Sequence, residues 1–121
     1  MSCDVMVDQA LGMVQVTYHG EVLAEERKAA RDWVFQTCKE KSLSRVLVDL
    51  RDCTIQMNEK DAISFAANFK HAKDIPDYRV ACVFVQRNES ESLVEVLITH
   101  EGVNIKYFLS PEDATLWLMA R

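Results

Sequence analysis

The stretch that decides the fold is Arg45-Val46-Leu47-Val48-Asp49-Leu50, in which an arginine leads into apolar residues interrupted by one acid. Apolar residues at successive positions predict a strand that is covered on both faces, as in the middle of a parallel sheet. Residues 79–85 repeat the pattern as Arg-Val-Ala-Cys-Val-Phe-Val. We therefore expect two central strands that lie side by side and run in the same direction.

Three further segments have the pattern of half-buried strands. Val14, Val16 and Tyr18 alternate with polar residues, and Gly20 follows them. This spacing of two predicts a strand that ends at Gly20, with a short partner strand before it at about residues 3–7. Residues 103–107 alternate in the same way and predict a last strand.

Residues 22–41 predict the first helix. The apolar residues near helical spacing are Leu23, Ala30, Trp33, Val34 and Cys38. We expect this stripe, Trp33 included, to face the core. The charged residues between them are expected on the outer, solvated face: Glu25, Glu26, Arg27, Lys28, Arg31 and Asp32.

Three later helices are predicted from the residues at their starts. Asn58 with Asp61 three positions on, and Asn88 with Glu91, both have the pattern of a capping box. The first pair precedes a helix to about Ala72. The second precedes residues 93–98, where β-branched residues leave a strand as the alternative to the helix that we favour. Ser110-Pro111 begins a short final helix that carries Trp117, which we also expect in the core.

The order of elements is therefore strand, strand, helix, strand, helix, strand, helix, strand, helix. This alternation predicts an α/β fold with a mixed, mostly parallel central sheet of roughly four or five strands and about four helices, joined by right-handed crossovers. The chain has 121 residues, 49% of them apolar, which suits a single domain spanning residues 1–121. Ligands of such sheets bind beyond the carboxyl ends of the strands, where we expect the crossovers to diverge to opposite faces.

Composition narrows the classes of partner. The formal net charge is −5, and between residues 88 and 113 Lys106 is the sole base among the acids. Nucleic acid is disfavoured, because no basic stripe with interleaved aromatics is present. No apolar run is long enough for stable membrane insertion and no secretory signal is evident, so we expect a cytoplasmic protein. The cysteines show no C-x-x-C pair, and we expect most of them to be reduced and buried.

Motifs for catalysis or for cofactor binding are absent from the sequence. It contains neither a G-x-G-x-x-G turn nor a phosphate-binding loop, and no serine or cysteine has a nucleophile motif. We therefore predict no catalytic residue, no cofactor and no metal. Asp49 and Asp52 can hold a hard cation at a strand end, but we favour a structural role in which Asp49 accepts hydrogen bonds from its own loop.

Residues 45–52 and 79–85, together with the closing stretch 107–118, resemble small bacterial STAS/SEC14-type proteins, the anti-sigma-factor-antagonist-like or SpoIIAA-like group. The resemblance spans roughly Val14 to Leu118 and implies a STAS-like fold. In the anti-sigma branch it also implies a serine, phosphorylated as a switch, at the start of the helix after the Asp-ended strand. That place is held here by Asn58 and Glu59, so we expect no serine phospho-switch, and Glu59 supplies a permanent negative charge.

Three hypotheses on function follow. The first is a non-enzymatic regulatory or protein-interaction module that binds a protein, preferably a basic one, through this set: Asp52, Asn58, Glu59, Asn88, Glu89, Glu91 and Glu95. The second is a carrier or sensor of a small apolar ligand or lipid that uses residues 93–98, which suit a homodimer interface equally well. The third is a metal-assisted enzyme or receiver-like phosphoacceptor that uses Asp49 and Asp52.

Overall fold

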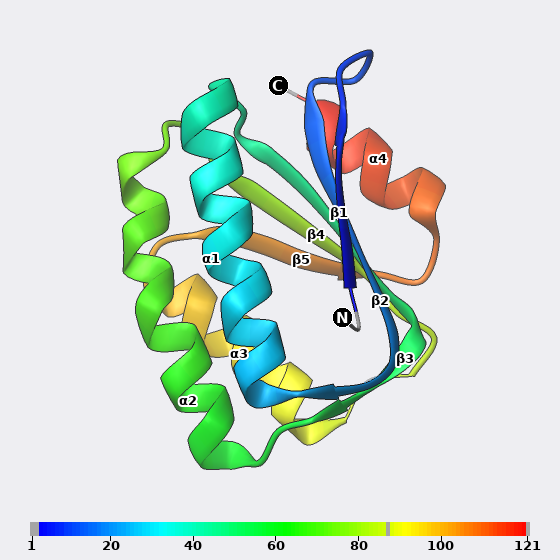
Figure 1. The fold of residues 1–121 in the computed structure, drawn as a ribbon, viewed down its shortest axis with the longest axis vertical. Coiled ribbons are helices and arrows are strands. Elements are labelled where there is room, and N and C mark those ends of the chain that lie inside the picture. The colour runs from blue at the N-terminus through cyan, green and yellow to red at the C-terminus, as the bar shows by residue number, and fades with distance from the viewer. Residues whose placement is uncertain (1–2, 87, 121) are drawn as a thin grey trace.

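The computed structural model describes residues 3–86 and 88–120, and its elements follow the expected order (Figure 1). The strands are β1 (Cys3–Asp8), β2 (Met13–Leu23), β3 (Arg45–Gln56), β4 (Arg79–Val83) and β5 (Asn104–Phe108). The helices are α1 (Ala24–Lys41), α2 (Glu59–Ala67), α3 (Glu89–His100) and α4 (Pro111–Met119), and the 3-10 helix η1 (Asn68–Asp74) continues α2. The predicted α/β class is confirmed, and residues 93–98 are helical.

Within the described residues the strands form one five-stranded sheet in the order β1-β2-β3-β4-β5. The hairpin β1–β2 is antiparallel, and the other three pairings are parallel. The two apolar runs are neighbours as expected, with Val46 opposite Val80. The prediction of a mixed, mostly parallel sheet is confirmed.

All three crossover helices lie on one face of this sheet. Figure 1 shows α1, α2 and α3 together on one side and α4 on the other. The cause is the strand order: each new parallel strand is added in the same direction, so each right-handed crossover returns over the same face. Our expectation that the crossovers diverge to opposite faces is wrong, and the strands β2 to β5 contain no topological switch point.

Each face of the sheet has its own apolar core. The larger one joins the sheet to α1, α2 and α3, with Val14, Val46 and Val80 packed against residues such as Phe65 and Ile98. The smaller one joins the sheet to α4. Arg45 and Arg79 hold the carboxyl end of α4: Arg45 Nε donates to Leu118 O at 2.8 Å, and Arg79 Nη1 donates to Trp117 O at 3.1 Å. The positive charges of the two arginines also interact favourably with the negative end of the helix dipole.

β2 and β3 are longer than predicted, whereas β4 ends at Val83, two residues before the predicted end of its strand. β2 continues past Gly20 to Leu23, and β3 continues to Gln56 in parallel register with it, from Gly20↔Cys53 to Leu23↔Gln56. Pairing between β3 and β4 stops earlier, at Asp49↔Val83. β2 and β3 therefore project beyond β4 as a two-stranded ribbon, and Leu23 is the exposed N-cap of α1 rather than a helical core residue.

The buried and exposed faces of helix α1 differ from those predicted. Trp33 is 46% exposed, so the prediction that it belongs to the core is wrong. Arg27 and Arg31, which we expected in solvent, are buried. Trp117 is partly buried and packs against Phe108, at a ring separation of 5.7 Å.

Candidate functional site

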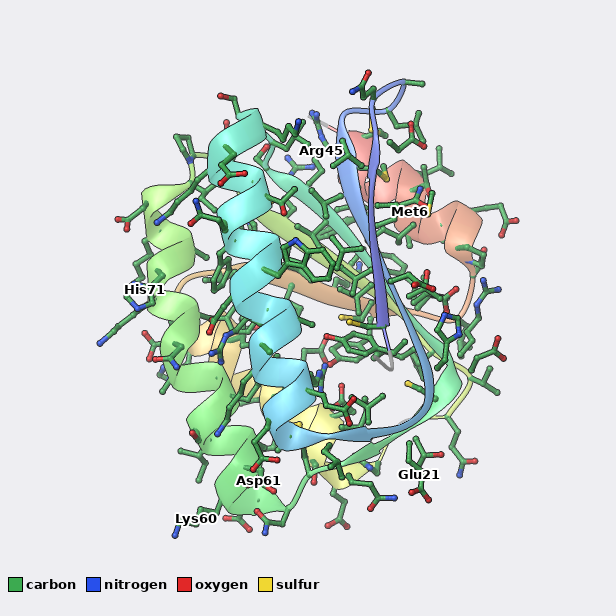
Figure 2. All side chains as sticks on the ribbon, viewed as in Figure 1. Met6, Glu21, Arg45, Lys60, Asp61 and His71 are labelled. Atoms are coloured by element: carbon green, nitrogen blue, oxygen red, sulfur yellow. The ribbon has the colours of Figure 1, made fainter. Side chains whose placement is uncertain are left out.

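The starts of α2 and α3 lie at the end of the molecule where the parallel strands finish. Asn58 caps α2: its Oδ1 accepts from Asp61 N at 2.8 Å, and Asp61 Oδ2 accepts from Asn58 N at 3.2 Å, which completes the predicted capping box. Figure 2 shows Lys60 and Asp61 at this end of the molecule, together with Glu21 near the end of β2.

Helix α3 starts beside α2. Asn88 Oδ1 accepts from Glu91 N at 2.9 Å, and Ser90 Oγ donates to Met57 O at 2.7 Å, which ties the start of α3 to the segment before α2. The structure thus brings together four of the predicted contact residues, all exposed, which we call the acidic rim: Asn58, Glu59, Asn88 and Glu89. Asp52 is also exposed, but it lies within β3, opposite His19 of β2, and is not part of the rim. Glu95 is only partly exposed and lies more than one helical turn after Glu89 along α3.

Glu91 does not belong to the rim. Its side chain turns into the protein, and the residue is only 3% exposed, so our prediction of Glu91 as a surface contact residue is wrong. Its Oε2 pairs with Arg27 of α1, which is also 3% exposed, and its Oε1 accepts from Tyr107 Oη at 2.8 Å. An ion pair in the core therefore joins α1 to α3, and the hydrogen bond from Tyr107 adds β5.

Aromatic and backbone contacts complete this buried network. The Arg27 guanidinium lies over the Phe65 ring at 4.6 Å, and Arg31 Nη1 donates to Phe65 O at 2.8 Å. Burial disfavours the charge on Arg27, but the Glu91 carboxylate outweighs it and holds the pKa of Arg27 above its ordinary value. Burial raises the pKa of Tyr107, so this phenol stays a neutral donor.

The sequence contained a signal for this network that our prediction missed. Arg27 lies three residues before Ala30 and seven before Val34, so it is on the buried stripe of α1 by spacing alone. We assigned it to solvent because it is charged. For Tyr107, the sequence contained no indication of a role in this network beyond its place on a strand with alternating apolar residues.

A cleft of about 350 Å³ opens between the projecting part of β3 and the segment that leads from β4 into α3. Its lining is half apolar and half polar: Leu50, Arg51, Cys53, Thr54, Ile55, Phe84, Val85, Gln86, Asn88 and Glu91. Cys53 is partly exposed there, and burial raises the pKa of its thiol to about 11. The cleft is within the size range of binding sites and adjoins the acidic rim.

A second, smaller pocket of about 40 Å³ lies between the sheet and α1, α2 and α3. This volume has room for water and none for a lipid chain. The apolar run on α3 is largely accounted for by packing, since Val94 and Ile98 are buried and Leu93 and Leu97 lie against the same core. Val96 remains exposed.

Asp49 is held by its own strand. It accepts hydrogen bonds from Arg51 N and Nε at 3.0 Å each and from Arg51 Nη2 at 2.9 Å. These bonds hold the pKa of Asp49 below its ordinary value. Asp52 is exposed near His19 of β2, with which it is in register. Within residues 3–86 and 88–120, no three His, Cys, Asp or Glu side chains gather as a metal site would require.

The fold is similar to that of two solved structures. The first is an uncharacterized protein of the DUF3478 family with a SpoIIAA-like fold from Shewanella loihica PV-4, with a TM-score of 0.62, 14% sequence identity, and coverage of 97% of this chain and 94% of that one. The second is the anti-sigma factor antagonist SpoIIAA in its unphosphorylated form, with a TM-score of 0.52, 7% identity, and coverage of 78% and 96%. The chain therefore has a STAS/SpoIIAA-like fold, as its resemblance implied.

No protein-family model and no curated protein sequence matches the chain. Among its described helices, none has the length and apolar character that crossing a membrane requires.

Proposed function

We propose that this STAS-type domain is a non-enzymatic regulatory module that works by binding a basic protein through the acidic rim. The observation that carries the proposal is the rim itself, in which two helix starts are tied by the Ser90–Met57 bond and present the exposed carboxylates of Glu59 and Glu89. The anti-sigma factor antagonist that shares the fold is named for an action on another protein.

Electrostatics supports a basic partner. Exposed carboxylates at one end of the molecule raise the local concentration of a cationic protein and fix its orientation on approach. Glu59 and Glu89 also lie in the first turns of α2 and α3, where the helix dipole adds positive potential and acidic side chains are favourable. The rim thus keeps its negative charge without any modification.

The test is direct binding by a purified partner. Proteins captured from a native lysate on the immobilised chain are identified, purified, and titrated by calorimetry at low and high salt. We expect a basic protein whose affinity falls with salt and falls about fivefold for the variant Glu59→Gln/Glu89→Gln. The matched control, Glu40→Gln/Asp77→Asn, removes two exposed acids at the opposite end of the molecule and should bind like the natural chain.

Two outcomes would contradict the proposal. One is the lack of any protein that binds directly after purification. The other is a partner whose affinity is the same for the rim variant and for the control variant. Native mass spectrometry of the chain alone adds a check, because a bound lipid would favour the carrier hypothesis instead.

A further inference from the structure

The inference starts from a free strand edge inside the molecule. β3 pairs with β2 as far as Leu23↔Gln56, but with β4 only as far as Asp49↔Val83. After Val83 the chain leaves the sheet: Phe84 N still donates to Phe108 O at 3.0 Å, and the next residues bend toward α3. Within the part of the chain that the structure describes, no strand pairs with β3 beyond Asp49 on this side.

The cleft of about 350 Å³ lies along this edge. Its walls come from the projecting part of β3, including Cys53 and Ile55, and from Phe84 and Val85 after β4. A strand edge offers a row of backbone donors and acceptors, and an added strand lies about 4.8 Å away. A free edge that borders a cleft with apolar and polar walls suits the recognition of an extended peptide by strand addition.

We propose that an extended, basic segment of the partner protein adds to the free edge of β3 in this cleft. The proposal rests on the function proposed above and names how the partner is held at the same end of the molecule. Glu89 is exposed next to Asn88, which lines the cleft, and Asp52 is exposed on β3 between the lining residues Arg51 and Cys53. The guanidinium of Arg51 is already engaged by Asp49. Main-chain hydrogen bonds would supply affinity, and the flanking carboxylates would select lysine and arginine.

The outer edge of the sheet that β1 forms is less suited to the same role. Asp4 and Asp8 lie two positions either side of Met6 on this edge. If two copies paired there with Met6 opposite Met6, each Asp4 would face an Asp8 of the other copy, which is unfavourable. Charges on an edge strand are a common protection against self-association.

The experiment selects peptides of about six residues, the usual length of a strand, from a random phage-displayed library on the full chain. Selected peptides are synthesised with a fluorescent label and titrated. We expect lysine or arginine alternating with apolar residues, and an affinity that falls about tenfold for Val85→Trp, which fills the cleft. Leu116→Trp is the matched control, because Leu116 is 71% exposed on α4 and Val85 is 69% exposed. It should leave the affinity unchanged.

Alkylation of Cys53 gives a second measurement on the natural chain. Cys53 lines the cleft, whereas Cys3, Cys38 and Cys82 are buried, so the reaction reports on the cleft. A saturating peptide should slow the alkylation of Cys53 about tenfold. Strand addition is overturned if no peptide is enriched, if acidic peptides are selected, if Val85→Trp binds as well as Leu116→Trp, or if Cys53 reacts at the same rate. A basic protein partner that binds the rim but leaves Cys53 reactive would overturn strand addition alone and leave the proposed function standing.

Discussion

Glu91 has the sequence position of a capping residue, but its side chain makes a buried ion pair instead. Its place three residues after Asn88 predicts a side chain that turns back to cap α3. Its carboxylate instead pairs with Arg27 and accepts from Tyr107. The reason is energetic: a buried guanidinium without a partner costs several kcal/mol, whereas a capping bond contributes about 1 kcal/mol. Arg27 therefore determines where Glu91 points.

We expect Glu91→Gln to lower the free energy of unfolding by about 3–5 kcal/mol, because it leaves the Arg27 charge buried and uncompensated. The double variant Arg27→Met/Glu91→Leu should recover most of the loss, since apolar side chains of similar volume replace a buried pair well. Urea unfolding followed by circular dichroism measures both. Glu89→Gln, on the exposed first turn of the same helix, is the control and should change stability by less than about 0.5 kcal/mol. Equal effects of Glu91→Gln and Glu89→Gln would show that the pair does not hold the core together.

Cys53 has a pH dependence of its own. Burial raises the pKa of its thiol to about 11, so at pH 8 only a small fraction is the reactive thiolate. We expect its alkylation rate to rise about tenfold per pH unit from pH 8 to 10, measured by mass spectrometry of the alkylated peptide. The variant Cys53→Ser is the control: the alkylated peptide assigned to Cys53 should be missing from its mass spectrum. A rate that levels off near pH 9 would contradict a raised pKa.

At the scale of elements, α2 is a helix whose start was predicted in full. Its capping box is present on both sides, through Asn58 and Asp61. We expect Asn58→Ala to lower the free energy of unfolding by about 1 kcal/mol and Asn58→Gly by only a few tenths, because glycine leaves the cap backbone open to water. Thermal and urea unfolding of the two variants measure the difference. Equal losses would mean that the side-chain bond contributes nothing to α2.

Helix α1 shows what periodicity leaves undecided. The spacing of apolar residues located the helix, but the assignment of every charged residue to solvent failed at Arg27 and Arg31. The partner that makes the burial of Arg27 tolerable is 64 residues away in sequence, on another helix. A local pattern carries no information about such a partner. Trp33 failed for the complementary reason: it is apolar, but it lies outside the stripe of α1 that is buried, which includes Arg27 and Val34.

At the scale of the whole molecule, the cleft arises from unequal strand lengths. The apolar runs predicted which strands are central and parallel, and both predictions are confirmed. They could not predict that β2 and β3 extend beyond β4, because residues 52–56 are held in the strand by pairing with residues 19–23, not by their own pattern. The acidic rim was predicted from helix-start residues, whereas the cleft beside it depends on this tertiary pairing.

The molecule as a whole should lose stability in alkali. Burial raises the pKa of Cys38 to about 11 and that of Cys82 to about 12, and it also raises the pKa of Tyr18, Tyr78 and Tyr107. In the unfolded chain a thiol titrates near 8.5 and a tyrosine near 10. Because the fold favours the neutral forms, their contribution is fully present below about pH 8.5 and is lost as the pH rises toward the folded values.

We expect the free energy of unfolding to be flat near pH 7 and to fall between pH 9 and 10, by about 1.4 kcal/mol per pH unit for each of the buried thiols Cys38 and Cys82. Urea unfolding at a series of pH values measures the slope. Cys38→Ala is the matched variant: it should be less stable at pH 7, because it leaves a small cavity. Its stability should nevertheless fall less steeply above pH 9, because one of the titrating groups is gone. A variant with the same slope as the natural chain would mean that Cys38 ionises as readily in the folded protein as in water, which its place in the core forbids.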